Sequence, residues 1–340
     1  MRAAHCSGPG RIDLREAAQP TPAAGEVIVK VRNCGVCGSD LHWYHGGFPP
    51  PAVCPGHEIS GEVVELGAEV RGVKPGDRVA VEPLVVCGEC HACRTGDLQL
   101  CRKLRILGTM VDGGFAEYVR TPASALFHLP AALDWELGAM TEPLAVCVHA
   151  VQLANVRLGD RTLILGAGTI GLLSVVAARS AGAGEVLITA RHPHQHAAAV
   201  ALGARAFATT DDGEAELSEY ARRHPIDAVI ETVGGSTDTV NEAVQLVRAG
   251  GTISVLGVFM APLSLNGLLL IMKEVHIIGS LTYSRAGHRA DFDVALDLLV
   301  SQCDRLQPLI THRYPLDQIG EAFATAADKK SGAIKVTIAS

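Results

Sequence analysis

Residues 162–171 read Thr162-Leu-Ile-Leu-Gly166-Ala-Gly168-Thr-Ile-Gly171, an apolar run that ends in three closely spaced glycines. The uncharged stretch continues to residue 178, but its length reaches only the low end of the ~17–25 residues that span a bilayer. Since the glycines also divide it, a buried strand, turn and helix fit better. In dinucleotide loops the first glycine makes the turn, the second lets the backbone approach the pyrophosphate, and the third lets the helix pack on the sheet. The stretch predicts such a loop, with a ligand-free glycine turn as the alternative.

Strands and helices alternate around this loop. The spacing of apolar residues changes after Glu142-Pro143, where a helical pattern around Ala145–Leu153 begins. Apolar runs then recur about every 20–30 residues with helical patterns between them, which is the rhythm of βαβ units in a doubly wound parallel sheet. The expected strands are Thr162–Leu165, Glu185–Thr189, Ala206–Thr209, Ala228–Thr232, Thr252–Leu256 and Val275–Ile278.

The first 150 residues differ, because Gly and Pro punctuate short β-branched runs. This texture predicts a barrel-like, mostly antiparallel β domain. The runs are Glu26–Val31, Gly61–Leu66 and Asp77–Val81; the tail adds expected helices Ala290–Ser301 and Leu316–Ala327 and a strand Ala333–Ile338. We expect the tail to return to the β domain. The predicted α/β chain then has one discontinuous domain, residues 1–146 with 287–340, and a dinucleotide-binding domain, residues 147–286.

Composition narrows the possible partners and compartment. The 340 residues carry a net charge of −7, from 29 basic and 36 acidic residues, with no long block of either sign. Nucleic acid and anionic membranes are therefore not expected as partners. Of the ten cysteines, those at 6, 54, 147 and 303 are single and have no disulfide spacing. Together with the lack of a signal peptide at the N-terminus, this favours the reducing cytoplasm and metal-bound thiolates.

Four cysteines form a closely spaced group. Cys87, Cys90 and Cys93 are three residues apart, and Cys101 follows eight positions later. Zinc in structural sites binds four thiolates tetrahedrally, and a short loop can bring such a set together. This spacing predicts a closed, structural zinc site.

A second set of metal ligands lies upstream and is open. Cys37 and the pair His57-Glu58 could supply the three protein ligands of a catalytic zinc, with the fourth position left for water or substrate. Glu142 could bind the metal directly or through its water. Each residue alone is more often structural. Their occurrence with the cysteine lobe and the glycine loop predicts a dehydrogenase with two zinc ions per chain.

The end of the second strand of the parallel sheet predicts the cofactor. An acidic residue there usually binds the adenosine ribose, but this strand ends in Ala190-Arg191. Without the carboxylate a 2′-phosphate is not repelled, and a guanidinium can pair with it. We therefore expect NADP rather than NAD, with a solvent-facing Arg191 and bound NAD as the alternative. His192, His194 and His196 are expected to be surface residues.

The chain resembles the zinc-containing medium-chain alcohol and polyol dehydrogenases over nearly its whole length. The motifs that carry the resemblance are Gly-Val-Cys37-Gly-Ser-Asp-Leu-His42, Pro-Gly-His57-Glu58, the cysteines at 87–101, Glu142-Pro-Leu-Ala-Val, Gly166–Gly171 and Thr311-His-Arg-Tyr-Pro. The Glu142 segment is similar to the sorbitol, butanediol and threonine dehydrogenase branch, and Ala190-Arg191 is similar to NADP-using ketose reductases. The resemblance implies a GroES-like β domain, a Rossmann domain, and a homodimer or homotetramer.

It also implies a small alcohol or ketone as substrate and a set of site residues. Zinc would lower the pKa of the alcohol, and a hydride would pass to the nicotinamide. Ser39 and His42 are similar to the family's proton relay, with a structural hydrogen bond of His42 as the alternative. Trp43 and Tyr283 are expected to wall the substrate pocket, although core aromatic residues would look the same. The expected cofactor residues are Gly166, Gly168, Thr169, Ile170, Gly171, Ala190, Arg191, Val233, Leu256, Gly257, Leu281 and Thr282.

One departure bears on the substrate. Sorbitol dehydrogenases have an Arg-Tyr pair where this chain has Thr282-Tyr283, which puts sorbitol itself in doubt and favours a smaller diol, another sugar alcohol or a cyclitol. The alternatives are a threonine-type amino-alcohol dehydrogenase and a non-catalytic relative similar to lens crystallins. A zinc-free quinone reductase would lack the zinc ligands. A zinc-finger nucleic-acid binder would leave residues 150–290 unexplained.

Overall fold

The computed structural model describes residues 1–340, which divide into two compact units. Unit 1 comprises Met1–Glu142 and Ser284–Ser340, and unit 2 comprises Pro143–Tyr283. These limits lie three to four residues from the expected domain boundaries. None of the helices combines the length and the apolar composition needed to cross a membrane.

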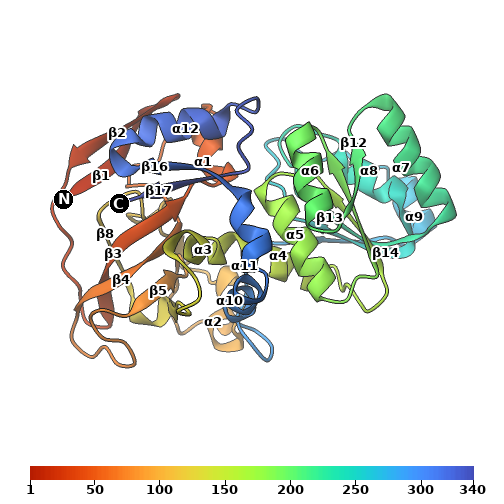
Figure 1. Ribbon diagram of the computed structural model, residues 1–340. Coiled ribbons are helices and arrows are strands. Elements are labelled where there is room, and N and C mark those ends of the chain that lie inside the picture. Colours follow the sequence, from red (N-terminus) through yellow and green to blue (C-terminus); the bar gives the residue numbers. More distant parts are fainter. The chain divides into compact units, whose positions relative to one another are not determined.

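Unit 1 is built around a seven-stranded sheet that is antiparallel except for one parallel pair, β16–β17 (Figure 1). Its strands run in the order β16 (Ile310–Pro315), β17 (Lys335–Ala339), β3 (Glu26–Gly35), β4 (Glu58–Leu66), β5 (Arg78–Val81) and β9 (Leu126–His128), and β8 (Tyr118–Pro122) also pairs with β3. The first and last parts of the chain therefore share one sheet. The strand expected from residue 61 begins at Glu58, so this metal-ligand candidate is held by sheet hydrogen bonding.

Smaller elements complete unit 1. Two short sheets pair β1 (Arg2–Gly8) with β2 (Arg11–Glu16) and β6 (Leu84–Val85) with β7 (Arg105–Ile106). The helices are α1 (Gly38–Tyr44), α2 (His91–Thr95), α3 (Trp135–Ala139), α10 (Asp291–Ser301), α11 (Cys303–Leu306) and α12 (Ile319–Ala327), and α4 (Thr141–Leu153) runs from unit 1 into unit 2. The helix expected from residue 316 begins at Ile319, because a 3₁₀ turn, Leu316–Gln318, precedes it.

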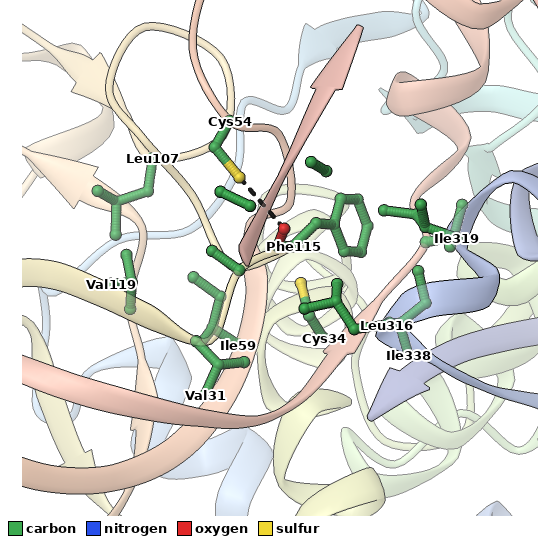
Figure 2. Close-up of a cluster of buried hydrophobic side chains, with 14 of the residues drawn as sticks. Val31, Cys34, Cys54, Ile59, Leu107, Phe115, Val119, Leu316, Ile319 and Ile338 are labelled. Atoms are coloured by element: carbon green, nitrogen blue, oxygen red, sulfur yellow. Dashed lines mark hydrogen bonds between the residues drawn. The ribbon is translucent and has the colours of Figure 1, made fainter. Parts of the chain in front are cut away.

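The core of unit 1 fixes the loop that leads to His57 (Figure 2). Cys34 of β3, Ile59 of β4 and Phe115 are buried together there. The Cys54 thiol donates a hydrogen bond to the Phe115 carbonyl oxygen at 3.3 Å. A Cβ at Gly56 would lie 2.9 Å from the Cys34 sulfur, and Gly56 has φ +99°, so this close turn requires glycine. The packing leaves the loop little freedom just before its histidine.

Unit 2 is a doubly wound parallel sheet of six strands, as the sequence predicts (Figure 1). The order is β12 (Arg205–Ala208), β11 (Glu185–Ala190), β10 (Arg161–Leu165), β13 (Ile226–Glu231), β14 (Val247–Val255) and β15 (His276–Gly279). The connecting helices are α5 (Thr169–Ser180), α6 (Pro193–Ala201), α7 (Asp211–Arg223), α8 (Thr239–Leu246) and α9 (Gly267–Lys273). The strand order reverses direction between β10 and β13, and open α/β sheets bind ligands at the carboxyl ends of the strands at such a point.

Candidate metal centres and dinucleotide site

The four cysteines of residues 87–101 converge on one point. The four sulfur atoms all lie within 4.8 Å of one another, and none of these cysteines is in a disulfide. Neighbouring sulfurs are 3.5 Å apart for Cys90 and Cys93, 3.6 Å for Cys87 and Cys101, and 3.9 Å for Cys87 and Cys93. Four thiolates around zinc at ~2.3 Å would be about 3.8 Å apart, so the cluster fits a tetrahedral zinc ion.

Backbone donors favour the thiolate at two of these four cysteines, whereas burial and the neighbouring sulfur atoms raise the pKa of Cys93 to about 12. N–H groups of Glu89 and Cys90 lower the pKa of the Cys87 thiol, and the N–H of Cys93, first among several donors, lowers that of Cys90 to about 6. A thiolate is the form that binds metal. All four positions around the ion would be filled by sulfur, which leaves no place for a substrate and suits a structural role.

The second candidate centre brings together Cys37, His57 and Glu58. Their ligand atoms also lie within 4.8 Å of one another, and the His57 and Glu58 side chains are buried. Cys37 immediately precedes α1, and Glu58 begins β4, directly opposite Gly35 of β3. A soft thiolate, an imidazole and a carboxylate are a donor set that zinc accepts, and three protein ligands leave a position open.

Asp40 connects two of these residues and was missed by the sequence analysis. Its carboxylate accepts a hydrogen bond from the Cys37 N–H at 3.0 Å, and its other oxygen lies 3.8 Å from Nδ1 of His57. Asp40 is fully buried. Burial lowers the pKa of His57, but the charges of Asp40 and Cys37 outweigh it and raise that pKa above its usual value. The spacing of Asp40, three residues after Cys37 at a helix start, was the available signal.

Glu142 lies beside the cluster rather than within it. It is buried in the first turn of α4 and is not one of the three residues whose ligand atoms converge. Burial is the main cause that raises the pKa of Glu142 to about 7, with His57 lowering it and Glu58 raising it. Glu142 therefore lies near the metal site, where the charges of His57 and Glu58 act on its carboxyl group.

The proposed proton relay and substrate wall have different surroundings. Ser39 is exposed and His42 is half-buried on α1, three residues apart and so on neighbouring positions of the helix. Burial lowers the pKa of His42, and His45 lowers it further. Trp43 is instead part of the hydrophobic core, with its ring 5.3 Å from that of Phe323, and Tyr283 in unit 2 is buried.

The glycine loop of unit 2 has the properties of a phosphate cradle. Gly166 follows β10 with φ +95°, and a Cβ at Gly171 would overlap the Gly166 carbonyl oxygen. Gly168, the N-cap of α5, is exposed and has open space where a Cβ would be. Backbone N–H groups at the start of this 12-residue helix can bind a phosphate. The loop thus fits a dinucleotide, and a different physical requirement explains the glycine at each of the three positions.

The next strand ends without an acidic residue. Ala190 closes β11 and is buried, and Arg191 follows it, exposed and without an ion pair. Its guanidinium is free to bind an anion. His192 caps α6 and stacks on His194 with ring centroids 5.5 Å apart. The three histidines of this segment do not form a metal-ligand group.

The remaining cofactor candidates also follow strands of the parallel sheet. Val233 comes after β13, Leu256-Gly257 after β14, and Leu281-Thr282 after β15, so all lie on the carboxyl side of the sheet with the glycine loop. Val233 and Leu281 expose apolar side chains there. Glu231 fixes the segment, because its buried carboxylate accepts hydrogen bonds from the Val233 and Gly234 N–H groups at 2.8 and 2.9 Å.

Comparisons with known proteins identify the family of the chain and the fold of both units. Residues 23–131 match the alcohol dehydrogenase GroES-like domain, and residues 169–301 match the zinc-binding dehydrogenase domain. The sorbitol dehydrogenase of Halalkalibacterium halodurans is 37% identical over 97% of this chain and 96% of its own. A zinc-binding dehydrogenase structure from Sinorhizobium meliloti, bound to NADP, has a TM-score of 0.88 at 34% identity, covering 100% and 99% of the two chains. The 2R,3R-butanediol dehydrogenase of Bacillus subtilis has a TM-score of 0.87 at 31% identity, with the same coverage.

Proposed function

We propose that this chain, which belongs to the zinc-dependent alcohol and polyol dehydrogenase family, oxidises a secondary alcohol of a diol, sugar alcohol or cyclitol with NADP as its preferred cofactor. Membership of the family makes the chain a zinc-dependent, nicotinamide-dependent oxidoreductase. The observation that supports the chemistry best is the convergence of Cys37, His57 and Glu58 within 4.8 Å of one another. The choice of substrate and cofactor is the proposal.

In the proposed mechanism Cys37, His57 and Glu58 hold the catalytic zinc, with Glu142 beside it. When bound, zinc supplies Lewis acidity that makes the alcohol a stronger acid, and the nicotinamide supplies the hydride acceptor. Asp40 accepts a hydrogen bond from the Cys37 N–H and places its carboxylate beside the His57 ring. Ser39 and His42 carry the released proton toward solvent, consistent with the exposure of Ser39 and the lowered pKa of His42.

The NADP preference is supported by the end of β11. Arg191 is a free guanidinium next to a buried alanine, and an acidic residue that would repel a 2′-phosphate is missing. The NADP-bound relative of 34% identity is consistent with this choice. The metal thiolates also need reducing conditions, so we propose a cytoplasmic location.

The test is a coenzyme-reduction screen of diols, pentitols, hexitols, cyclitols and L-threonine, each with NADP and with NAD. The proposal predicts turnover with at least one polyol and a higher kcat/KM with NADP. Turnover with L-threonine alone would favour the amino-alcohol alternative. No turnover with any alcohol by a protein that holds two zinc ions would contradict the proposed substrate class.

Unit 2 also carries an apolar surface that supports a homo-oligomer. Leu268, Ile271 and Met272 of α9 are each more than two-thirds exposed. The neighbouring strand β15 is at the edge of its sheet and pairs only with β14. Open edge strands and contiguous apolar patches favour association, and a two-fold axis would bury both on a second copy of the chain. Sedimentation analysis should give a dimer or tetramer that Ile271→Lys dissociates; a monomeric wild-type protein would contradict the assembly.

A further inference from the structure

Lys335 is the one Lys or Arg among the buried residues of the chain, with 2% of its surface exposed. It lies on β17, near the C-terminus, and donates a hydrogen bond to the Val36 carbonyl oxygen at 3.0 Å. Its ammonium group also forms an ion pair with the Glu58 carboxylate. An amine that gives up hydration needs such a partner, and here the partner is a candidate zinc ligand.

The ion pair crosses three strands. Gly35 of β3 is opposite Glu58 of β4 on one side and Thr337 of β17 on the other. Lys335 and Glu58 therefore meet over Gly35. A Cβ at Gly35 would overlap the Glu58 carboxylate and lie 2.7 Å from Cε of Lys335. The glycine is needed for the close approach, so the sheet has a place built for this pair.

The charges around the candidate metal explain why a cation is useful there. A Cys37 thiolate and a Glu58 carboxylate already balance a divalent ion, so negative charge on the buried carboxyl groups of Asp40 and Glu142 is left over. Lys335 lies next to the two charged ligands, since Glu58 touches it and Cys37 follows the Val36 carbonyl that it binds. The ammonium can offset the remaining charge, and its ion pair with Glu58 holds that carboxylate in place.

We propose that Lys335 is a positioning residue of the catalytic metal centre, acting through Glu58. The inference rests on the proposed function, because it takes Cys37, His57 and Glu58 as the zinc ligands. A purely structural ion pair would stabilise the fold without affecting how tightly the metal is held. A positioning residue changes the metal site itself, and losing a partner of a metal ligand typically weakens metal binding about 10- to 100-fold.

The test compares zinc binding in the full-length wild-type protein and in Lys335→Met, by competition with a chromogenic chelator. We expect one of two zinc ions to be held about 10- to 100-fold more weakly, and the visible spectrum of cobalt(II) in that site to change. Lys335→Arg, which keeps the charge, should remain close to wild type. Arg285→Met is the matched control, because it breaks a pair with the buried carboxylate of Glu82, which is not a metal-ligand candidate.

A double variant separates the pair from general damage. If Lys335 acts through Glu58, adding Lys335→Met to Glu58→Gln should weaken zinc binding much less than Lys335→Met does alone. Unchanged zinc affinity and an unchanged cobalt spectrum in Lys335→Met would overturn the proposal, even if the variant melts earlier. Should Lys335→Met not fold, the zinc affinity of Glu58→Gln is compared with that of the double variant. A large difference between the two would contradict action through Glu58. A wild-type protein with one zinc, lodged in the cysteine lobe, would overturn the proposed function as well.

Discussion

The carboxylate of Asp40 lies 3.8 Å from Nδ1 of His57 and is fully buried beside it. The same carboxylate accepts a hydrogen bond from the Cys37 N–H, so one acidic side chain lies beside two candidate ligands from different parts of the chain. Histidine ligands of zinc commonly direct their second nitrogen to a carboxylate, which fixes the ring and strengthens the ligand.

Asp40→Ala should weaken the second zinc site about 10- to 100-fold, because it removes the partner of His57 and of the Cys37 backbone. Asp40→Asn keeps an acceptor for the Cys37 N–H without the charge, and should fall between Ala and wild type. Chelator competition measures both variants. If Asp40→Ala binds two zinc ions as tightly as the wild type, the contact with His57 does not support metal binding.

Cys93→Ser should destabilise the protein more than it slows the chemical step. A closed thiolate site contributes folding free energy, and the serine hydroxyl is a poor zinc ligand. We expect zinc content to fall from two to one per chain, Tm to decrease, and kcat to change little in the molecules that remain folded. Calorimetry with metal analysis checks this, with the remote Cys303→Ser as control. Unchanged zinc content and Tm would show that this lobe binds no metal.

Ala190→Asp combined with Arg191→Leu should shift cofactor preference from NADP toward NAD. The 2′-phosphate carries about −1.5 to −2 charge, which an aspartate would repel and the arginine can bind. A lost charged hydrogen bond is worth about 1.5–3 kcal/mol, or about 10- to 150-fold in affinity for NADP. Ratios of kcat/KM for the two cofactors measure the shift, and Arg191→Lys should retain part of the preference. A wild-type protein that already prefers NAD would contradict the role of these two residues.

Glu185→Gln should lower the free energy of unfolding by about 1 kcal/mol at neutral pH. Burial tends to raise the pKa of Glu185, but hydrogen bonds from Tyr220 and Arg161 outweigh it and hold the pKa below 4.5. A carboxyl group whose pKa is lowered by folding stabilises the protein at every pH above its pKa in the unfolded state. This stabilisation is lost as the pH falls through the pKa in the folded state. Urea unfolding at pH 7 and near pH 4 should show the difference shrinking. Asp297→Asn, at an exposed pair with Arg289, is the control, and a difference that is constant with pH would contradict the pairing.

Local motifs explain how much of the site could be predicted from the sequence. The glycine loop, the four cysteines and the pair His57-Glu58 each predict a role from a few neighbouring residues, and the fold class follows from the spacing of strands. Lys335 could not be found in this way, because it lies 299 residues from the Val36 carbonyl that it binds. Only the return of the chain to the first sheet brings it to Glu58. Trp43 is the opposite case, because the sequence offered it as a substrate contact and the structure buries it in the core. An aromatic residue of the core and one beside the substrate cannot be told apart from the sequence.

The zinc mechanism is tested most directly by Cys37→Ala, with zinc content, NADP binding and polyol oxidation measured on the same preparation. We expect zinc to fall from two to one per chain and alcohol oxidation to be lost, because the open metal site loses its thiolate. NADP binding should remain close to wild type, since its proposed site lies on unit 2. Full turnover by Cys37→Ala with a single zinc per chain would contradict catalysis at this centre.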